Sequence, residues 1–341
     1  MNPPSADPVT HPYDALLPEV ILDAVEQQGF RCSGELLALN SYENRVYRIG
    51  IEDGPPLAAK FYRPERWSDA QILEEHGFAA ELHEHEIPAV APLADANDAT
   101  LHEHDGYRYT LFPWQPGRVA ELNTDEHYRV LGRYLGRLHA LGAARSFVHR
   151  PRLTPQTFGH EPVQYLLQES DQIPRHLTEA YRSLTEQLLT LIEQRFTDAA
   201  PVREIRLHGD CHLGNLLWID EAPHIVDFDD CRSGPAVQDL WMLLSGERGE
   251  QEHQLATVLE GYTAFCSFDA RELQLVEALR TLRLLHYSAW LAQRWSDPAF
   301  PQAFPWFGND RYWEEQVLIL REQQALLQEP PLQWSGGGGY F

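Results

Sequence analysis

The sequence predicts an α+β protein of two lobes, a small one built on an antiparallel sheet and a large one that is mostly helical. Three observations support this prediction. The 341 residues are too many for one compact core. Short apolar segments separated by turn residues fill the first third of the chain, and segments with helical periodicity fill most of the rest.

The first lobe is expected to span residues 18–115. A helix is predicted over residues 18–28, because Pro18 suits a first turn and Gly29 suits the position after a last turn. Short apolar runs then predict three strands, namely LLALNS (36–41), RVYRIGI (45–51) and LAAKFYR (57–63).

A second helix is predicted over residues 68–86, with Ser68 as its N-cap and with Ile72, Phe78, Ala79 and Leu82 at helical spacing. The segment TLHEHDGYRYTLFPW, residues 100–114, predicts two strands around an Asp-Gly turn. The first lobe is therefore expected to hold five strands and an inserted helix.

The second lobe is expected to span residues 116–334. Residues 125–142 carry Val130, Tyr134, Leu138 and Leu141 at helical spacing. Further helices are predicted within residues 176–197, 236–244, 254–265, 272–295 and 313–327, whereas residues 145–175 are expected to be irregular and residues 216–228 to hold a β-hairpin. The polar or glycine-rich ends, residues 1–17 and 335–341, are expected to be flexible tails.

The composition restricts the partners. A formal net charge of −24 disfavours nucleic acids and anionic membrane surfaces, so neither is an expected partner. The four cysteines form no C-x-x-C pair. Since the sequence has no signal peptide and no apolar run of membrane-spanning length, we expect a cytoplasmic protein.

The stretch HGDCHLGN, residues 208–215, has three interpretations. His208, Asp210 and His212 alternate as in zinc or binuclear hydrolases, although no third histidine ligand stands in a paired motif. The stretch could also be an ordinary loop. The third interpretation is a phosphoryl-transfer loop, in which a carboxylate at Asp210 precedes a carbonyl ligand for Mg²⁺ at Asn215 with four residues between them.

The surrounding sequence favours the third interpretation. In kinases a second metal-binding Asp follows the loop after a short hairpin, and HIVDFDD places Asp227 there. A kinase also needs a lysine on its third strand and a Glu on the following helix. Lys60 ends the third predicted strand and is the only lysine in the chain. Glu75 shares a helix face with apolar residues and is the chosen partner, while Glu74 remains an alternative.

The sequence also resembles a known family. HGDCHLGNLLW followed by VDFDD is similar to the aminoglycoside phosphotransferase and choline kinase branch of the protein kinase-like fold. LNSYENRVY, KFYRPERW, QILEEH, LGRYLGRLH, GPAVQDLWMLL and AQRWSDPAFP resemble the stress response kinase A family of bacterial Ser/Thr protein kinases. This resemblance covers nearly the whole chain.

The resemblance implies the bilobal kinase-like fold, ATP and Mg²⁺ as cofactors, and phosphoryl transfer to Ser/Thr hydroxyls of proteins by a cytoplasmic monomer in a stress response. It implies a catalytic role for Asp210, Mg²⁺ ligation by Asn215 and Asp227, an active-site role for Asp227, and an ATP contact for Ser41. Lys60 and Glu75 belong to the same nucleotide site.

The sequence departs from the general kinase pattern in three places. No G-x-G-x-x-G is present, so the phosphates are expected to contact Ser41 or Asn44 and backbone N–H groups. D-F-G is replaced by D-F-D at residues 227–229, and no A-P-E segment occurs. These departures fit a small-molecule hydroxyl kinase of the aminoglycoside, choline or homoserine type equally well, and that activity remains the alternative. A nucleotide-binding pseudokinase and a metal-dependent hydrolase are less favoured.

Two further residues are expected to support the loop rather than to react. Asp239 is predicted to accept hydrogen bonds from the backbone of the loop, and His212 is predicted to orient or stabilise it.

Overall fold

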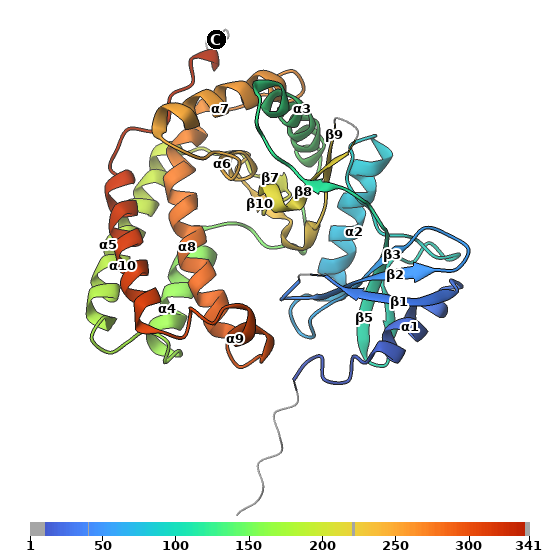
Figure 1. The fold of residues 1–341 in the computed structure, drawn as a ribbon. Coiled ribbons are helices and arrows are strands. Elements are labelled where there is room, and N and C mark those ends of the chain that lie inside the picture. Colours follow the sequence, from blue (N-terminus) through green and yellow to red (C-terminus); the bar gives the residue numbers. More distant parts are fainter. Residues whose placement is uncertain (1–10, 40, 220–221, 338–341) are drawn as a thin grey trace, which may run out of the picture.

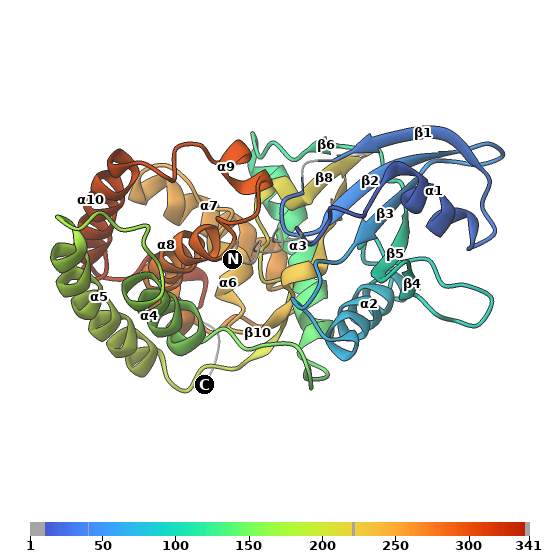
Figure 2. The ribbon, with the colours of Figure 1, turned by 90° about the horizontal axis from the view of Figure 1, so that it is seen from below.

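The computed structural model describes residues 11–39, 41–219 and 222–337, and it has two lobes (Figures 1 and 2). The first lobe is built on a five-stranded antiparallel sheet in the order β1-β2-β3-β5-β4. Its strands and helices are α1 (Pro18–Glu26), β1 (Cys32–Ala38), β2 (Arg45–Ile51), β3 (Leu57–Phe61), α2 (Asp69–Glu84), β4 (His102–His104) and β5 (Tyr107–Pro113). The small antiparallel lobe predicted from the sequence is confirmed.

Strand β3 presents two different faces. Ala59 and Phe61 are fully buried in an apolar cluster that includes Ile21 and Val25 of α1. Because successive side chains of a strand point to opposite faces, Lys60 lies on the other side of the sheet, where α2 packs. The alternation of side chains along this strand therefore places apolar residues on the face that covers the core and Lys60 on the face toward α2.

Helix α2 begins at the predicted N-cap. Ser68 Oγ accepts the backbone N–H of Gln71, and Gln71 Oε1 accepts the backbone N–H of Ser68, which forms a capping box. Ile72, Phe78 and Leu82 are buried as predicted. Phe78 and Leu82 join the apolar cluster of the second lobe, so α2 connects the two lobes.

The second lobe is mostly helical. Its helices are α3 (Asp125–Gly142), α4 (Glu161–Gln168), α5 (Thr178–Ala199), α6 (Val237–Trp241), α7 (Arg248–Tyr262), α8 (Val276–Gln293), α9 (Ala299–Ala303) and α10 (Asp310–Leu326). The prediction that residues 145–175 are irregular holds at both ends of this segment but is wrong for its middle, where a π-helical turn (Gln156–His160) and α4 lie. Pro162 suits the first turn of α4, and Leu166 anchors that helix in the core.

Among the described helices, none combines the length and the apolar character needed to span a membrane.

Helix α3 is rotated relative to the predicted apolar stripe. Val130 and Tyr134 are only half-buried, whereas Leu131 and Leu135 are fully buried. Gly132 lies on the buried face, where a Cβ would collide with backbone atoms of α7. The close approach of two helix backbones, which a stripe of large apolar residues does not reveal, therefore sets the rotation of α3.

Two small sheets position the 208–215 stretch. β7 (Ile205–Leu207) pairs with β10 (Arg232–Gly234), and β8 (Leu216–Ile219) pairs with β6 (Arg118–Val119) and with β9 (Ala222–Ile225). The predicted hairpin is thus confirmed as β8 and β9. Backbone bonds from β9 to the segment after α2, between Ile225 and both Pro88 and Val90, join this hairpin to the first lobe.

The chain ends differ from the expected tails. Tyr13 and Leu16 are buried in the core of the first lobe, and the Tyr13 hydroxyl donates to the Glu43 carbonyl at 3.1 Å, so residues 11–17 are not a loose tail. Residues 335–337 form a short 3₁₀ turn. Residues 1–10 and 338–341 lie outside the described part of the chain.

Candidate active site

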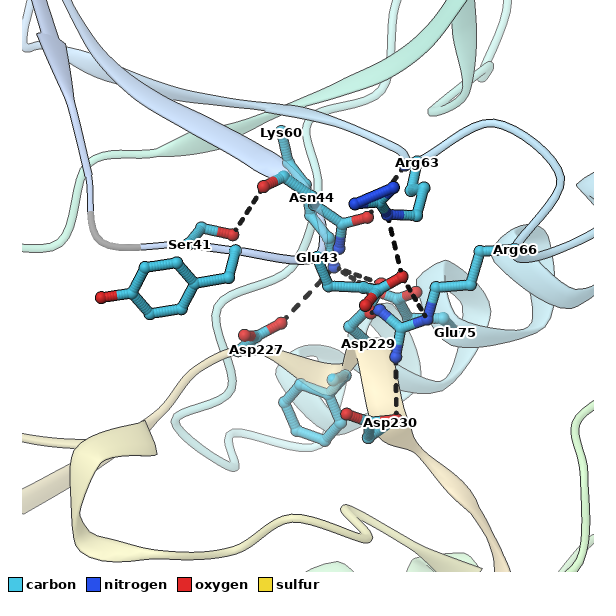
Figure 3. Close-up of polar contacts among 12 residues, drawn as sticks. Ser41, Glu43, Asn44, Lys60, Arg63, Arg66, Glu75, Asp227, Asp229 and Asp230 are labelled. Atoms are coloured by element: carbon cyan, nitrogen blue, oxygen red, sulfur yellow. Dashed lines mark hydrogen bonds and ion pairs between the residues drawn. The ribbon is translucent and has the colours of Figure 1, made fainter. Parts of the chain in front are cut away.

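Lys60 is the centre of a buried cluster of charged side chains between the lobes (Figure 3). Its Nζ lies 2.9 Å from Asp229 Oδ1, 3.1 Å from Glu75 Oε1 and 3.5 Å from Asp227 Oδ1. Burial lowers the pKa of Lys60, but the carboxylates of Asp229 and Glu75 outweigh this effect and hold the pKa well above its usual value. The amine is therefore charged at physiological pH.

The structure pairs Lys60 with Glu75, the partner chosen from the helix register, and gives Glu74 a different task. The Glu74 carboxylate accepts three successive backbone N–H groups of residues 148–150, at 2.6, 2.7 and 2.7 Å. Burial raises the pKa of Glu74, and these bonds outweigh it and lower the pKa. Glu74 thus anchors a loop of the second lobe to α2.

Asp229 is the site residue that sequence reasoning missed. It is buried, and its carboxylate pairs with Arg66 as well as with Lys60. Burial raises the pKa of Asp229, but Arg66 and Lys60 outweigh it and hold the pKa well below its ordinary range. The sequence feature that could have revealed Asp229 is its carboxylate at the position where the D-F-G motif has glycine.

The backbone conformation at residue 209 explains why glycine stands at this position of the 208–215 loop. Gly209 has φ +85°, and a Cβ there would collide with the carbonyl oxygen of Asp230, so only glycine fits. Asp239 accepts the N–H groups of His208 and Gly209, each at 2.9 Å, and lies 3.0 Å from Nε2 of His139. The supporting role predicted for Asp239 is confirmed.

The histidines of this loop are occupied by hydrogen bonds. His208 Nε2 lies 2.9 Å from the Val226 carbonyl oxygen, and His208 Nδ1 accepts the Asp210 N–H at 3.3 Å. His212 Nδ1 accepts the Gly214 N–H at 2.9 Å, which agrees with a stabilising role. Within the described ranges, no group of three His, Cys, Asp or Glu side chains is placed to hold a metal. Both histidine side chains therefore take part in hydrogen bonds that hold the loop.

Asp210 is held in its ionised form. One carboxylate oxygen pairs with Arg283 of α8, and the other lies 3.4 Å from His212 Nε2. Burial raises the pKa of Asp210, but His212 and Arg283 outweigh it and hold the pKa well below its usual value. The backbone oxygen of Asp210 accepts a bond from Asn215 Nδ2 at 3.0 Å, which fixes the two residues relative to each other.

Asn215 and Asp227 supply oxygen atoms that suit a hard cation. Asn215 uses its amide nitrogen to bond Asp210, so its amide oxygen is the atom left for a ligand. Asp227, two residues after the end of β9, has φ +61°, and 56% of its side chain is exposed, at the wall of the same cavity as Asn215. Amide and carboxylate oxygens are the ligands that Mg²⁺ prefers, so this pair fits that ion.

The cavity has a volume of about 360 Å³ and combines polar residues with the apolar side chains of Val46, Val90 and Leu217. Ser41 and Asn44 lie on its wall. Ser41 Oγ donates to the Asn44 carbonyl at 3.0 Å, and Asn44 Oδ1 accepts the backbone N–H of Arg63 at 3.1 Å. Ser41 thus stabilises the turn that precedes β2, and Asn44 joins this turn to the segment after β3. Their contacts with phosphate remain predictions.

Comparison with known proteins agrees with this fold and site. The model of the phosphotransferase enzyme family matches residues 35–276. Stress response kinase A of Escherichia coli (strain K12) is 46% identical over 321 residues, which cover 94% of this chain and 96% of the relative. Serine/threonine protein kinase RdoA of Salmonella typhimurium is 47% identical over 322 residues, with the same two coverages.

Solved structures share the fold at low identity. An amicoumacin kinase in complex with AMP-PNP, Ca²⁺ and its ligand superposes with a TM-score of 0.69 at 18% identity, covering 91% of this chain and 94% of that one. A microcompartment-associated aminopropanol kinase has a TM-score of 0.65 at 18% identity, covering 89% and 96%. Fold and site together define a two-lobed kinase. The chain belongs to the phosphotransferase enzyme family and, within it, to the stress response kinase A family.

A buried carboxylate behind the loop makes stability depend on pH. Glu272 accepts the N–H of Val237 at 2.9 Å, at the start of the helix that carries Asp239. Burial raises the pKa of Glu272 from 4.5 to about 7, although the bond from Val237 opposes this. Because the folded pKa is the higher one, the folded state binds more protons in this interval, and stability falls as pH rises through it.

We expect Glu272→Gln to remove this dependence. Relative to the variant, the free energy of unfolding of the wild type should fall by up to about 1.4 kcal/mol per pH unit between the two pKa values. Urea unfolding at half-unit steps across the interval measures the difference, and Glu322→Gln, at an exposed position of α10, serves as the control. Parallel pH profiles for wild type and Glu272→Gln would contradict the assignment.

Proposed function

We propose that this kinase transfers the γ-phosphoryl group of ATP, with Mg²⁺, to Ser/Thr hydroxyls of proteins in a stress response. The observation that carries the proposal is that Lys60, Asn215 and Asp227 line one cavity, while Asn215 also bonds the backbone of Asp210. The names of the curated relatives support a protein acceptor and the stress setting. The cytoplasm as location and a monomer as the active form belong to the same proposal.

Each residue has a role that follows from its chemistry. Lys60, held by Glu75, binds the phosphates of ATP as a fixed positive charge. The oxygens of Asn215 and Asp227 hold Mg²⁺, whose positive charge offsets the negative charge of the transferring group. Asp210 accepts the proton of the acceptor hydroxyl while that oxygen bonds to the γ-phosphorus. The bond from phosphorus to the bridging oxygen breaks, and ADP leaves with its electron pair.

A small-molecule acceptor is the second candidate. The observation in its favour is a separate cavity of about 200 Å³ beside Asp210, which is large enough for a compact molecule. The solved structures of similar fold include kinases whose names refer to amicoumacin and aminopropanol. The relatives at 46–47% identity favour the protein acceptor.

One assay separates these candidates. The purified chain is incubated with Mg²⁺ and ATP labelled at the γ-phosphate, in one arm with a mixture of proteins and in the other with a panel of small hydroxyl compounds. Label on serine or threonine of proteins supports the proposal, and label on small compounds alone supports the second candidate. Asp210→Asn run in both arms excludes a contaminating kinase. If neither arm gains label, phosphoryl transfer itself is contradicted.

Loss of Asp227 should weaken Mg²⁺-dependent nucleotide binding more than loss of Asn215. Asp227→Ala removes a charged ligand, whereas water can replace the neutral amide oxygen of Asn215. Titration of ATP at several Mg²⁺ concentrations measures the requirement. Asp23→Ala, at an exposed position of α1, removes an equal charge and serves as the control. An unchanged Mg²⁺ requirement for Asp227→Ala would contradict its role as a ligand.

A further inference from the structure

The cavity of about 200 Å³ beside Asp210 has an unusual charge for this chain. Three guanidinium groups and two carboxylates line it, namely Arg66, Arg232, Arg283, Asp210 and Asp230. The whole sequence has 51 acidic and 27 basic residues, so positive charge gathers here against the trend of the chain. A cluster of arginines in a concave site favours an anionic ligand.

Two of these arginines are already fixed. Arg66 lies 3.1 Å from Asp230, and Arg232 donates to the carboxylate and the carbonyl of Asp230, both at 2.7 Å. Arg232 is also buried and its guanidinium lies 4.6 Å from the ring centre of Phe158. Arg66 also pairs with the buried Asp229, so the carboxylates of Asp229 and Asp230 hold these two guanidinium groups in place.

Arg283 is different. Its side chain is 41% exposed, and in the described part of the chain its recorded partner is Asp210. On α8 it is followed at spacings of four and seven by Tyr287 and Trp290, which line the same cavity. Residues at these spacings share a helix face, so one face of α8 offers a partly exposed cation and two aromatic rings to the acceptor.

The contact between Arg283 and Asp210 conflicts with catalysis. A base must offer a carboxylate oxygen to the hydroxyl that it deprotonates. Here one oxygen of Asp210 pairs with Arg283, and the other is 3.4 Å from His212. With Arg283 drawn aside, one oxygen of Asp210 has no protein partner among the described residues and is available to the hydroxyl.

We propose that the acceptor carries an anionic group, a carboxylate or a phosphate, next to its hydroxyl, and that this group takes Arg283 away from Asp210. The inference rests on the proposed function, since it names the substrate class of the same site. Binding of the anion then frees Asp210 to accept the hydroxyl proton, which couples recognition to catalysis. A cationic acceptor of the choline type would instead face three guanidinium groups. Two kinds of acceptor can carry such an anionic group beside a hydroxyl, namely an acidic segment of a protein and a small hydroxy acid.

The first test measures binding without phosphoryl transfer. The protein with Mg²⁺ and ADP is titrated calorimetrically with two peptides that carry alanine in place of the acceptor serine, one flanked by Glu and one by Gln. We expect the Glu peptide to bind about tenfold or more tightly. Arg283→Gln should remove this preference and Arg283→Lys should retain part of it. Arg311→Gln, at a residue that is 84% exposed, should leave it intact.

The inference is overturned if the wild type prefers neither the Glu peptide over the Gln peptide nor glycerate over glycerol, or if Arg283→Gln keeps an undiminished preference. The same comparison with glycerate and glycerol identifies the source. A preference among the peptides points to a protein segment, and one limited to glycerate points to a small hydroxy acid. Since Arg283 is partly exposed, its replacement is expected to leave the fold intact, which a thermal unfolding scan checks.

The second test measures transfer to the matching peptides with serine. We expect the wild type to favour the Glu peptide in kcat/KM and Arg283→Gln to lose this preference, because the variant has no cation at this position to meet the Glu side chains. Transfer without discrimination by the wild type overturns the inference and leaves the kinase proposal standing. A binding preference without transfer to any acceptor contradicts the kinase proposal and leaves the anion site standing.

Discussion

Replacing Asp210 by asparagine is expected to lower kcat for phosphoryl transfer by about 10²–10⁴-fold, the usual contribution of a general base. Asparagine cannot accept the hydroxyl proton, and it also loses the charge that pairs with Arg283. Nucleotide affinity should stay close to that of the wild type, because Asp210 does not line the cavity that holds Lys60, Asn215 and Asp227. Steady-state kinetics and a nucleotide titration measure the two quantities separately.

Asp198→Asn is the matched control for this variant. It removes an equal charge from an exposed position near the end of α5 and should leave both quantities unchanged. Turnover of Asp210→Asn near that of the wild type would show that another group deprotonates the acceptor. A large loss of nucleotide affinity would show instead that the substitution disturbs the 208–215 loop.

Lys60→Met is expected to abolish transfer and to destabilise the fold. The amine stands among Glu75, Asp227 and Asp229, and its removal takes the nearest cation from the buried Glu75 and leaves the buried Asp229 with Arg66. Breaking a buried ion pair from one side costs about 3–5 kcal/mol of unfolding free energy. Urea unfolding measures this loss, and thermal unfolding with and without Mg²⁺ and ATP measures how much nucleotide binding remains.

Lys60→Arg separates the structural role from the catalytic one. Arginine keeps the positive charge but replaces a compact ammonium with a planar fork, so stability should largely return while transfer stays low. Lys60 is also the only lysine, so a lysine-directed acylating reagent reports on this one side chain, and ATP should protect it. Full activity of Lys60→Met would contradict the kinase mechanism, and a lack of protection by ATP would contradict the contact with phosphate.

Local sequence patterns were sufficient to predict much of the fold and the pairing of Lys60 with Glu75 at the centre of the site. The five strands of the first lobe follow from short apolar runs and turn residues, and the order of the chain brings Lys60 to the central part of that sheet. The helical period then distinguishes Glu75 from Glu74, because adjacent residues on a helix point about 100° apart. The spacing of Asp210 and Asn215 likewise places both on one short loop, where they bond each other.

Other features were decided by the tertiary structure alone. Arg283 pairs with a residue 73 positions earlier in the chain, and Asp229 pairs with Lys60 across the two lobes. The rotation of α3 follows from a glycine pressed against the backbone of α7. Periodicity and spacing describe neighbours within one helix, strand or loop. Contacts between distant segments depend on how the elements pack, and no interval in the sequence encodes them, so the pairing of Asp210 with Arg283 and of Lys60 with Asp229 emerged only from the folded chain.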